Sequence, residues 1–214
     1  IMIPLQTSFE EYLFRGYLMQ GIGVSSNLKG FGFIFVYVVV FIIIYFKLAY
    51  GNTLGPLEHV GIVSLGALIL FVFLAAGVIE KIQNTAFNDI LVKLFHRRST
   101  ALIATSVIFG GLHFFNPEVD KLGPILMVYY IGTGFLLGIM TLMDDGMELA
   151  LGFHAANNLF GALLVSADWT VLQTHSVLKD VSEPGQGYGD IFIPVFVVFP
   201  ILLIIFAKVY KWTN

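Results

Sequence analysis

The stretch FEEYLFRG, residues 9–16, places two adjacent carboxylates and an arginine inside an otherwise apolar segment, residues 1–22. On a helix, Glu11 and Arg15 are four residues apart and can pair on one face. Glu10 points about 100° away from Glu11, so its carboxylate is free to meet another group. An ionisable side chain within a membrane span costs roughly 2.5–3.5 kcal/mol and usually faces protein or a wet cavity. Packing alone does not explain such a cluster, although a surface amphipathic helix with an ordinary ion pair would also contain it.

Composition places most of the chain in a lipid bilayer, its first expected partner. Of 214 residues, 57% are hydrophobic and only 12% are charged, with a mean hydropathy of +0.88. A soluble domain carries about 25% charged residues, so this is a polytopic membrane protein. The absence of cysteine excludes disulfides and thiolate chemistry. No basic cluster with interleaved aromatics is present, so nucleic acid is not expected as a partner.

The predicted fold is all-α, a polytopic membrane bundle of about seven segments with the active site inside the bundle, in one domain over residues 1–214. Glycines and polar residues at 21–27 break the first segment, the polar stretch 80–99 forms a loop or interfacial helix, and residues 144–146 form a tight turn. Residue 1 is Ile without a preceding basic region, which indicates a trimmed, permuted or incomplete N-terminus rather than a signal peptide. The expected membrane segments are 1–22, 32–50, 60–79, 100–115, 124–143, 149–167 and 191–210.

Lysine and arginine are unevenly distributed between the two sides that these segments define. If every segment crosses, the side that holds the C-terminus has more basic residues than the other, which carries Lys47, Lys121 and Lys179. By the positive-inside rule the richer side is cytoplasmic. The sequence thus predicts a multi-pass protein of the cell (inner or plasma) membrane with a cytoplasmic C-terminus.

Three more polar residues lie in apolar segments: His113, His154 and Asn158. Phe109 and His113 are four residues apart, as are His154 and Asn158, so each pair shares a helix face. A single histidine in a membrane helix most often makes an interhelical hydrogen bond. If these residues converge with Glu10, they form a polar pocket suited to hydrolysis. A carboxylate can take a proton from water, a histidine can orient that water, and a His/Asn pair can donate to an oxyanion.

Three motifs carry a family resemblance: E-E-x-x-x-R at 10–15, F-x-x-x-H at 109–113 and H-x-x-x-N at 154–158. Together they resemble the signature of the CPBP family, the CAAX proteases and bacteriocin-processing enzymes, also called the Abi family. These are intramembrane glutamic endopeptidases. The resemblance covers roughly residues 4–23 and 97–165, and it implies a protease that acts on membrane-associated peptide or protein substrates.

The resemblance also implies individual roles. Glu10 would be the general base that activates water, with His113 as its partner. His154 and Asn158 would form the oxyanion side of the site. The residues expected to hold the site in place are Glu11, Arg15 and Phe109.

Catalysis in this family is read as glutamate-dependent and metal-free, so no cofactor is expected. A zinc ion held by Glu10, His113 and His154 is the alternative within the enzyme class, although the chain has no H-E-x-x-H motif. Prenylated CAAX tails, leader peptides and other membrane-anchored segments are all open as substrates.

The order of the segments departs from the family pattern. In relatives a short loop separates the helices of the first two motifs, and other membrane helices precede both. Here a two-helix block at 24–95 lies between them, which indicates either an insertion or a permuted order. Two other function classes also stay open. A proton-coupled transporter would use the same polar groups as a relay, and a non-catalytic scaffold or immunity protein could retain the fold without turnover.

Overall fold

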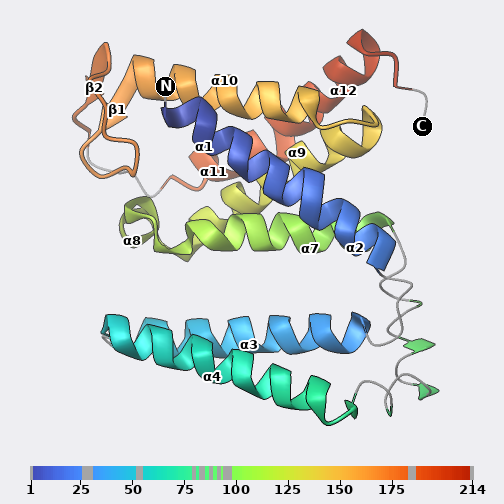
Figure 1. Cartoon of the computed structure of the whole chain (residues 1–214). Helices are drawn as coiled ribbons and strands as arrows, with labels where there is room; N and C mark the ends of the chain where they lie inside the picture. Colours follow the sequence, from blue (N-terminus) through green and yellow to red (C-terminus); the bar gives the residue numbers. More distant parts are fainter. Residues whose placement is uncertain are drawn as a thin grey trace. The chain divides into compact units, whose positions relative to one another are not determined.

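The computed structural model describes residues 2–25, 31–51, 55–78, 81, 85–86, 89–90, 93, 98–182 and 187–212. These residues are mostly helical, as predicted, with one short two-stranded sheet (Figure 1). The chain divides into two compact units, residues 1–21 with 101–214, and residues 22–100. The second unit nearly coincides with the block at 24–95 that the motif order sets apart. A single protease domain over the whole chain stays a prediction.

The N-terminal segment is helical throughout its described residues. Helix α1 (Met2–Glu11) continues into a π-helical turn, η1 (Tyr12–Met19), and then into α2 (Gln20–Ser25). The break predicted from Gly21 onward is therefore wrong at its start, because glycine weakens a helix by about 1 kcal/mol without ending it. The π-helical turn begins directly after the two glutamates, and such turns are frequent at functional sites.

The second motif leads into the central helix. Helix α7 (Arg98–Gly111) tightens into the 3₁₀ turn η2 (Leu112–Phe115) and is followed by α8 (Pro117–Leu122), η3 (Pro124–Leu126) and α9 (Met127–Met143). The predicted segment 124–143 is thus helical over its whole length. The predicted turn at 144–146 follows, with Asp145 at a φ of 51°, a left-handed conformation that aspartate tolerates better than most residues.

The third motif lies on α10 (Glu148–Leu164), which ends earlier than predicted. The segment expected to be helical to residue 167 instead becomes extended at Val165. Strand β1 (Val165–Ala167) then pairs in parallel with β2 (Leu178–Asp180). The prediction of a helix up to residue 167 is therefore wrong over its last three residues, because β-branched Val165 suits an extended strand and a later segment supplies the partner.

The last predicted segment is confirmed as helical, with a local irregularity. It comprises α11 (Gly189–Ile193), the π-helical turn η4 (Pro194–Val198) and α12 (Phe199–Val209). Pro200 lacks an N–H group and would clash with the carbonyl four residues earlier in a regular helix. The π-helical turn before it accommodates this mismatch.

Helix α9 is the centre of the first unit. It contacts α10, α11, α12, η2, η3 and η4, while α1 packs along α10 (Figure 1). The apolar core lies between α9, η1, α7 and α10, and its buried members are Phe14, Phe109, Leu136, Leu137, Met140 and Ala150.

The second unit contains a hairpin of two helices, α3 (Phe31–Gly51) and α4 (Pro56–Ala75). A hydrogen bond of 2.9 Å joins the hydroxyl of Tyr45 to the Nδ1 atom of His59. Helix α4 ends at Ala75 rather than at 79, and Gly77 follows with a φ of 65°, which glycine adopts without steric cost. Most of the polar stretch predicted at 80–99 lies outside the described residues.

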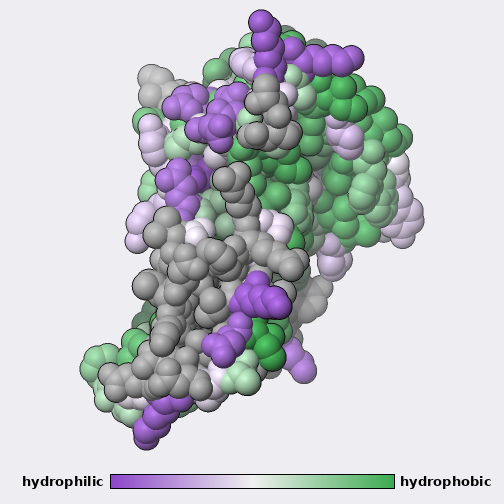
Figure 2. Space-filling model, turned by 90° about the vertical axis from the view of Figure 1, so that its right-hand side faces the viewer, coloured by the Kyte–Doolittle hydropathy of each residue, from purple (hydrophilic) through white to green (hydrophobic). Residues whose placement is uncertain are grey.

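Among the described residues, three helices are long and apolar enough to cross a membrane: Leu57–Ala75, Pro124–Met143 and Gly189–Val209. Two apolar helices, Val36–Tyr45 and Ser99–Phe115, are shorter. Only 6% of the Gly189–Val209 window is buried, and Figure 2 shows a broad hydrophobic surface, as expected for helices that face lipid. Seven crossing segments stay a prediction.

Close packing of α7 against α9 gives a stability prediction. A Cβ atom on Gly110 would lie 2.7 Å from the backbone nitrogen of Ile131, whereas one on Gly111 would meet nothing within 4 Å. Both glycines are helical, so alanine improves helix propensity equally. Gly110→Ala should nevertheless lower the free energy of unfolding by about 1–3 kcal/mol, and Gly111→Ala should not. Thermal unfolding in detergent checks this, and equal melting temperatures would contradict the close approach.

Candidate active site

The first motif provides a buried ion pair, as its spacing predicts. The Nη1 atom of Arg15 lies 2.9 Å from the Oε1 atom of Glu11, and the two side chains are 1% and 0% exposed. The Nη2 atom of Arg15 donates to the carbonyl of Gly134 at 3.2 Å, and its Cζ atom lies 4.4 Å from the ring centroid of Phe109. Arg15 therefore ties η1 to α9 by a charged hydrogen bond and to α7 by a cation–π contact.

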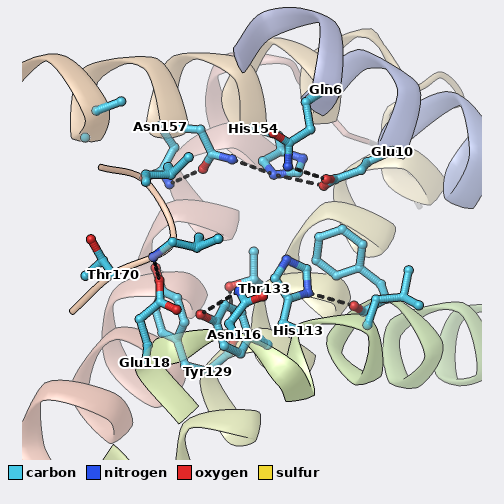
Figure 3. A pocket seen from close by; sticks show the side chains of 18 of the residues that line it. Gln6, Glu10, His113, Asn116, Glu118, Tyr129, Thr133, His154, Asn157 and Thr170 are labelled. Carbon is cyan, nitrogen blue, oxygen red and sulfur yellow. Dashed lines mark hydrogen bonds and ion pairs between the residues drawn. The ribbon is translucent and has the colours of Figure 1, made fainter. Parts of the chain in front are cut away.

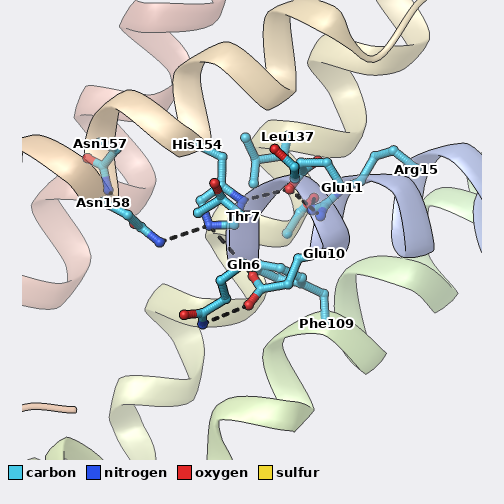
Figure 4. Close-up of polar contacts among 12 residues, drawn as sticks. Gln6, Thr7, Glu10, Glu11, Arg15, Phe109, Leu137, His154, Asn157 and Asn158 are labelled. Carbon is cyan, nitrogen blue, oxygen red and sulfur yellow. Dashed lines mark hydrogen bonds and ion pairs between the residues drawn. The ribbon is translucent and has the colours of Figure 1, made fainter. Parts of the chain in front are cut away.

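Glu10 faces a different environment, as its angular separation from Glu11 predicts. Its side chain is 20% exposed, and its Oε1 atom accepts a hydrogen bond of 3.1 Å from Gln6. Its Oε2 atom lies 3.8 Å from the Nε2 atom of His154 (Figure 4). The exposed side chain of Gln6 thus orients the carboxylate of Glu10, whose other oxygen faces His154 of the third motif.

His154 connects the first motif to the third. Its Nδ1 atom lies 2.7 Å from the Oε1 atom of Glu11, and its Nε2 atom lies 3.2 Å from the amide nitrogen of Asn158. His154 and Asn158 share one face of α10, as their spacing predicts (Figure 4). The contact between His154 and Glu11 is not expected from the sequence, since 143 positions separate the two residues.

His113 of the second motif lies in the 3₁₀ turn η2. Its Nδ1 atom is 2.9 Å from the carbonyl oxygen of Phe109, and its ring stacks on Tyr130 with centroids 4.4 Å apart. A carbonyl only accepts hydrogen bonds, so Nδ1 carries the hydrogen, and in the neutral imidazole Nε2 is then an acceptor. Figure 3 shows Glu10 and His154 on one side of a cavity and His113 on the opposite side.

Phe109 lies between the polar groups of all three motifs. Its side chain is buried, and its ring centroid is 5.1 Å from that of His113 and 5.8 Å from that of His154. The ring also contacts Phe14 edge-on at 5.4 Å. Phe109 therefore fits its predicted structural role, because its ring packs against both histidines.

The four residues predicted to be catalytic all line one cavity of about 460 Å³. This volume is within the range of small-molecule and peptide side-chain sites. The cavity combines apolar walls with polar groups from α1, η2 and α10 (Figure 3). The polar side chains lining it include Gln6, Glu10, His113, Asn116, Glu118, Thr133, His154, Asn157, Asn158 and Thr170.

Six of these polar residues are not predicted from the sequence, and two of them, Glu118 and Gln6, illustrate why. Glu118 is 9% exposed; its Oε1 atom accepts from the N–H of Val171 at 2.8 Å, while Oε2 has no hydrogen-bond partner among the described residues. A glutamate in the first turn of a helix is ordinary, so nothing in the sequence distinguishes it. Gln6 could have been found, since it lies one helical turn before Glu10.

The alternative of a zinc site does not fit this geometry. Within the described ranges, no three His, Asp or Glu side chains gather closely enough to hold a metal ion. Both ring nitrogens of His154 are already engaged, one by Glu11 and one by Asn158. The described residues therefore do not gather the three-ligand set of a catalytic zinc site.

Fold and site together define a helical protein with apolar outer surfaces and a polar cavity among its helices. Residues 62–160 match the family described as Type II CAAX prenyl endopeptidase Rce1-like. This match confirms the resemblance to the CAAX proteases that the three motifs predict. It contains the second and third motifs, while the first motif precedes it.

One curated relative is the uncharacterized protein YyaK of Bacillus subtilis (strain 168), which is 30% identical over 105 residues. The alignment covers 45% of this chain and 35% of that relative, so the chain spans about a third of the relative's length. No solved structure shows a significant match. The apolar helices and the family match together indicate a membrane protein that is similar to the CAAX proteases.

Proposed function

We propose that this protein is an intramembrane endopeptidase that hydrolyses peptide bonds of membrane-associated substrates, either CAAX-type tails or leader peptides. The observation that carries the proposal is the gathering of Glu10, His113, His154 and Asn158 around one cavity, although they come from three segments far apart in sequence. Polar groups in apolar helices are costly unless they are paired or used.

The two sides of the cavity suit the activation of a water molecule. The carboxylate of Glu10 and the Nε2 atom of His113 are both acceptors, so a water between them donates one hydrogen to each. Glu10 then acts as general base and takes a proton from this water, and the water oxygen attacks the peptide carbonyl. His113 orients the water and needs no proton of its own.

Asn158 is the group best suited to receive the negative charge on the carbonyl oxygen. Its amide can donate into the cavity from α10, beside His154. Removing one such donor typically costs about 10²–10³ in turnover, so Asn158→Ala should leave weak but measurable cleavage. Gln173→Ala is the control, because Gln173 is an exposed side-chain amide that donates to the carbonyl of Asp168 and does not line the cavity. Equal kcat losses in both variants would contradict this role.

The orientation in the membrane also gains support. The Nε1 atom of Trp212 donates to the Oδ1 atom of Asp144 at 3.0 Å, so the chain after α12 lies beside the turn after α9. This agrees with the proposal that the C-terminus and the turn at 144–148 share one side, the cytoplasmic side of the cell membrane.

Cleavage of quenched fluorogenic peptides in detergent tests the function, and proton flux in liposomes tests the transporter alternative. The protease proposal expects cleavage by the wild type and none by Glu10→Gln, without proton flux in either. Proton flux that depends on Glu10 without cleavage would establish a transporter. Neither activity would favour a scaffold or immunity protein.

Cleavage should also survive chelation, since the proposed base is a carboxylate rather than a metal-bound hydroxide. Steady-state rates with and without a zinc chelator provide the measurement. A loss of activity that added zinc restores would instead make Glu10, His113 and His154 metal ligands.

A further inference from the structure

The hydrogen bonds around His154 run in one direction. Asn157 donates to the Oδ1 atom of Asn158 at 3.3 Å, which turns the amide nitrogen of Asn158 toward the Nε2 atom of His154. On the other side of the ring, the Nδ1 atom lies 2.7 Å from Glu11, which also accepts from Arg15. The hydrogen bond from Asn157 thus orients the amide of Asn158 with its nitrogen toward the histidine.

This direction determines which nitrogen of His154 carries hydrogen. A carboxylate paired with an arginine only accepts hydrogen bonds, so Nδ1 holds the hydrogen that points to Glu11. The amide nitrogen of Asn158 only donates, so Nε2 must present its lone pair. In the resting state the nitrogen that faces Glu10 is an acceptor and cannot donate to a carbonyl oxygen.

The two histidines of the site differ in the partner of the Nδ1 atom. The Nδ1 atom of His154 has a buried carboxylate as its partner, whereas that of His113 has only the carbonyl of Phe109. A carboxylate on the far nitrogen orients the imidazole and stabilises the imidazolium form, as in Ser-His-Asp triads. His154, unlike His113, therefore has the hydrogen-bond partner that a proton-carrying histidine has in such triads.

We propose that His154 carries the proton from Glu10 to the leaving amine, an inference that rests on the proposed peptidase function. The oxygen of water forms a bond to the carbonyl carbon, and one water proton goes to the carboxylate of Glu10. That proton passes to the Nε2 atom of His154. When the carbon–nitrogen bond breaks, Nε2 gives the proton to the departing nitrogen, and the other water hydrogen leaves with the new carboxylic acid.

The distances suit this sequence. The Oε2 atom of Glu10 and the Nε2 atom of His154 are 3.8 Å apart, so they must approach by about 1 Å for direct transfer, and such contacts commonly tighten when substrate binds. Once Nε2 is protonated it no longer accepts from Asn158. The amide of Asn158 is then free to donate to the oxyanion of the tetrahedral intermediate until the carbon–nitrogen bond breaks.

Two substrates with the same acyl part separate a proton donor from an oxyanion donor. One has a peptide bond, whose amine must be protonated to leave, and the other has a nitrophenyl ester, whose leaving group departs without a proton. His154→Gln should slow peptide cleavage by about 10²–10⁴-fold and change ester cleavage by less than about tenfold. Asn158→Ala, the matched control, should slow both substrates by the same factor.

Equal loss of both activities in His154→Gln would overturn the proton-carrier proposal and leave His154 as an oxyanion donor. A wild type that cleaves neither substrate would instead refute the peptidase function on which it rests. If His154→Gln does not fold, nitrogen NMR of the wild type decides, with the ring assigned by elimination in variants of the other four histidines. A bare Nε2 in the resting protein supports the proposal, and a protonated Nε2 overturns it.

Discussion

Replacing Glu10 with glutamine is expected to abolish peptide cleavage while the fold stays intact. The amide keeps the shape of the side chain and can still accept from Gln6, but it cannot take a proton from water. Loss of a general base typically costs about 10²–10⁴ in rate. Glu10 is partly exposed and lies outside the buried ion pair. The melting temperature of the Glu10→Gln variant should therefore match that of the wild type.

The matched control is Glu148→Gln. Glu148 is exposed and lies in the first turn of α10, the helix that carries His154. It changes the net charge equally and should leave kcat unchanged. Wild-type turnover by the Glu10→Gln variant would show that Glu10 is not the general base.

Replacing Glu11 with alanine should have the largest effect on stability. Glu11 is fully buried and is the carboxylate partner of both Arg15 and His154. Removing one partner of a buried ion pair costs roughly 3–5 kcal/mol, because the remaining charge is uncompensated. We expect a large drop in melting temperature or failure to accumulate, measured by thermal unfolding in detergent.

A second substitution separates the charge effect from the lost volume. Adding Arg15→Met to Glu11→Ala removes the stranded charge, so the double variant should recover part of the stability. A double variant no more stable than Glu11→Ala would contradict the buried charge as the cause. If Glu11→Ala is stable and inactive while Glu10→Ala is active, Glu11 is the general base and the roles of the two glutamates are reversed.

Local spacing made much of this site predictable. Glu11 and Arg15, and likewise His154 and Asn158, are four residues apart, so a helix alone brings each pair together. The apolar runs at 124–143 and 191–210 are long enough to become helices on the same grounds. The different surroundings of Glu10 and Glu11 also follow from their angular separation on the helix.

Two contacts between distant segments were not predictable from the sequence. The bond from His154 to Glu11 depends on how α1 packs along α10. The end of α10 at Leu164 likewise depends on β2, which lies after it in the chain. Periodicity describes one segment at a time, so neither contact leaves a signal in the sequence.

Hydrolysis in water labelled with a heavy oxygen isotope shows whether the protein cleaves peptide bonds with a water molecule that Glu10 activates. Purified protein is incubated with a CAAX-type peptide, and the fragments are weighed by mass spectrometry. The account predicts one labelled oxygen in the new carboxyl group with the wild type, and intact peptide with Glu10→Gln. Intact peptide with the wild type, or equal cleavage by Glu10→Gln, would contradict it.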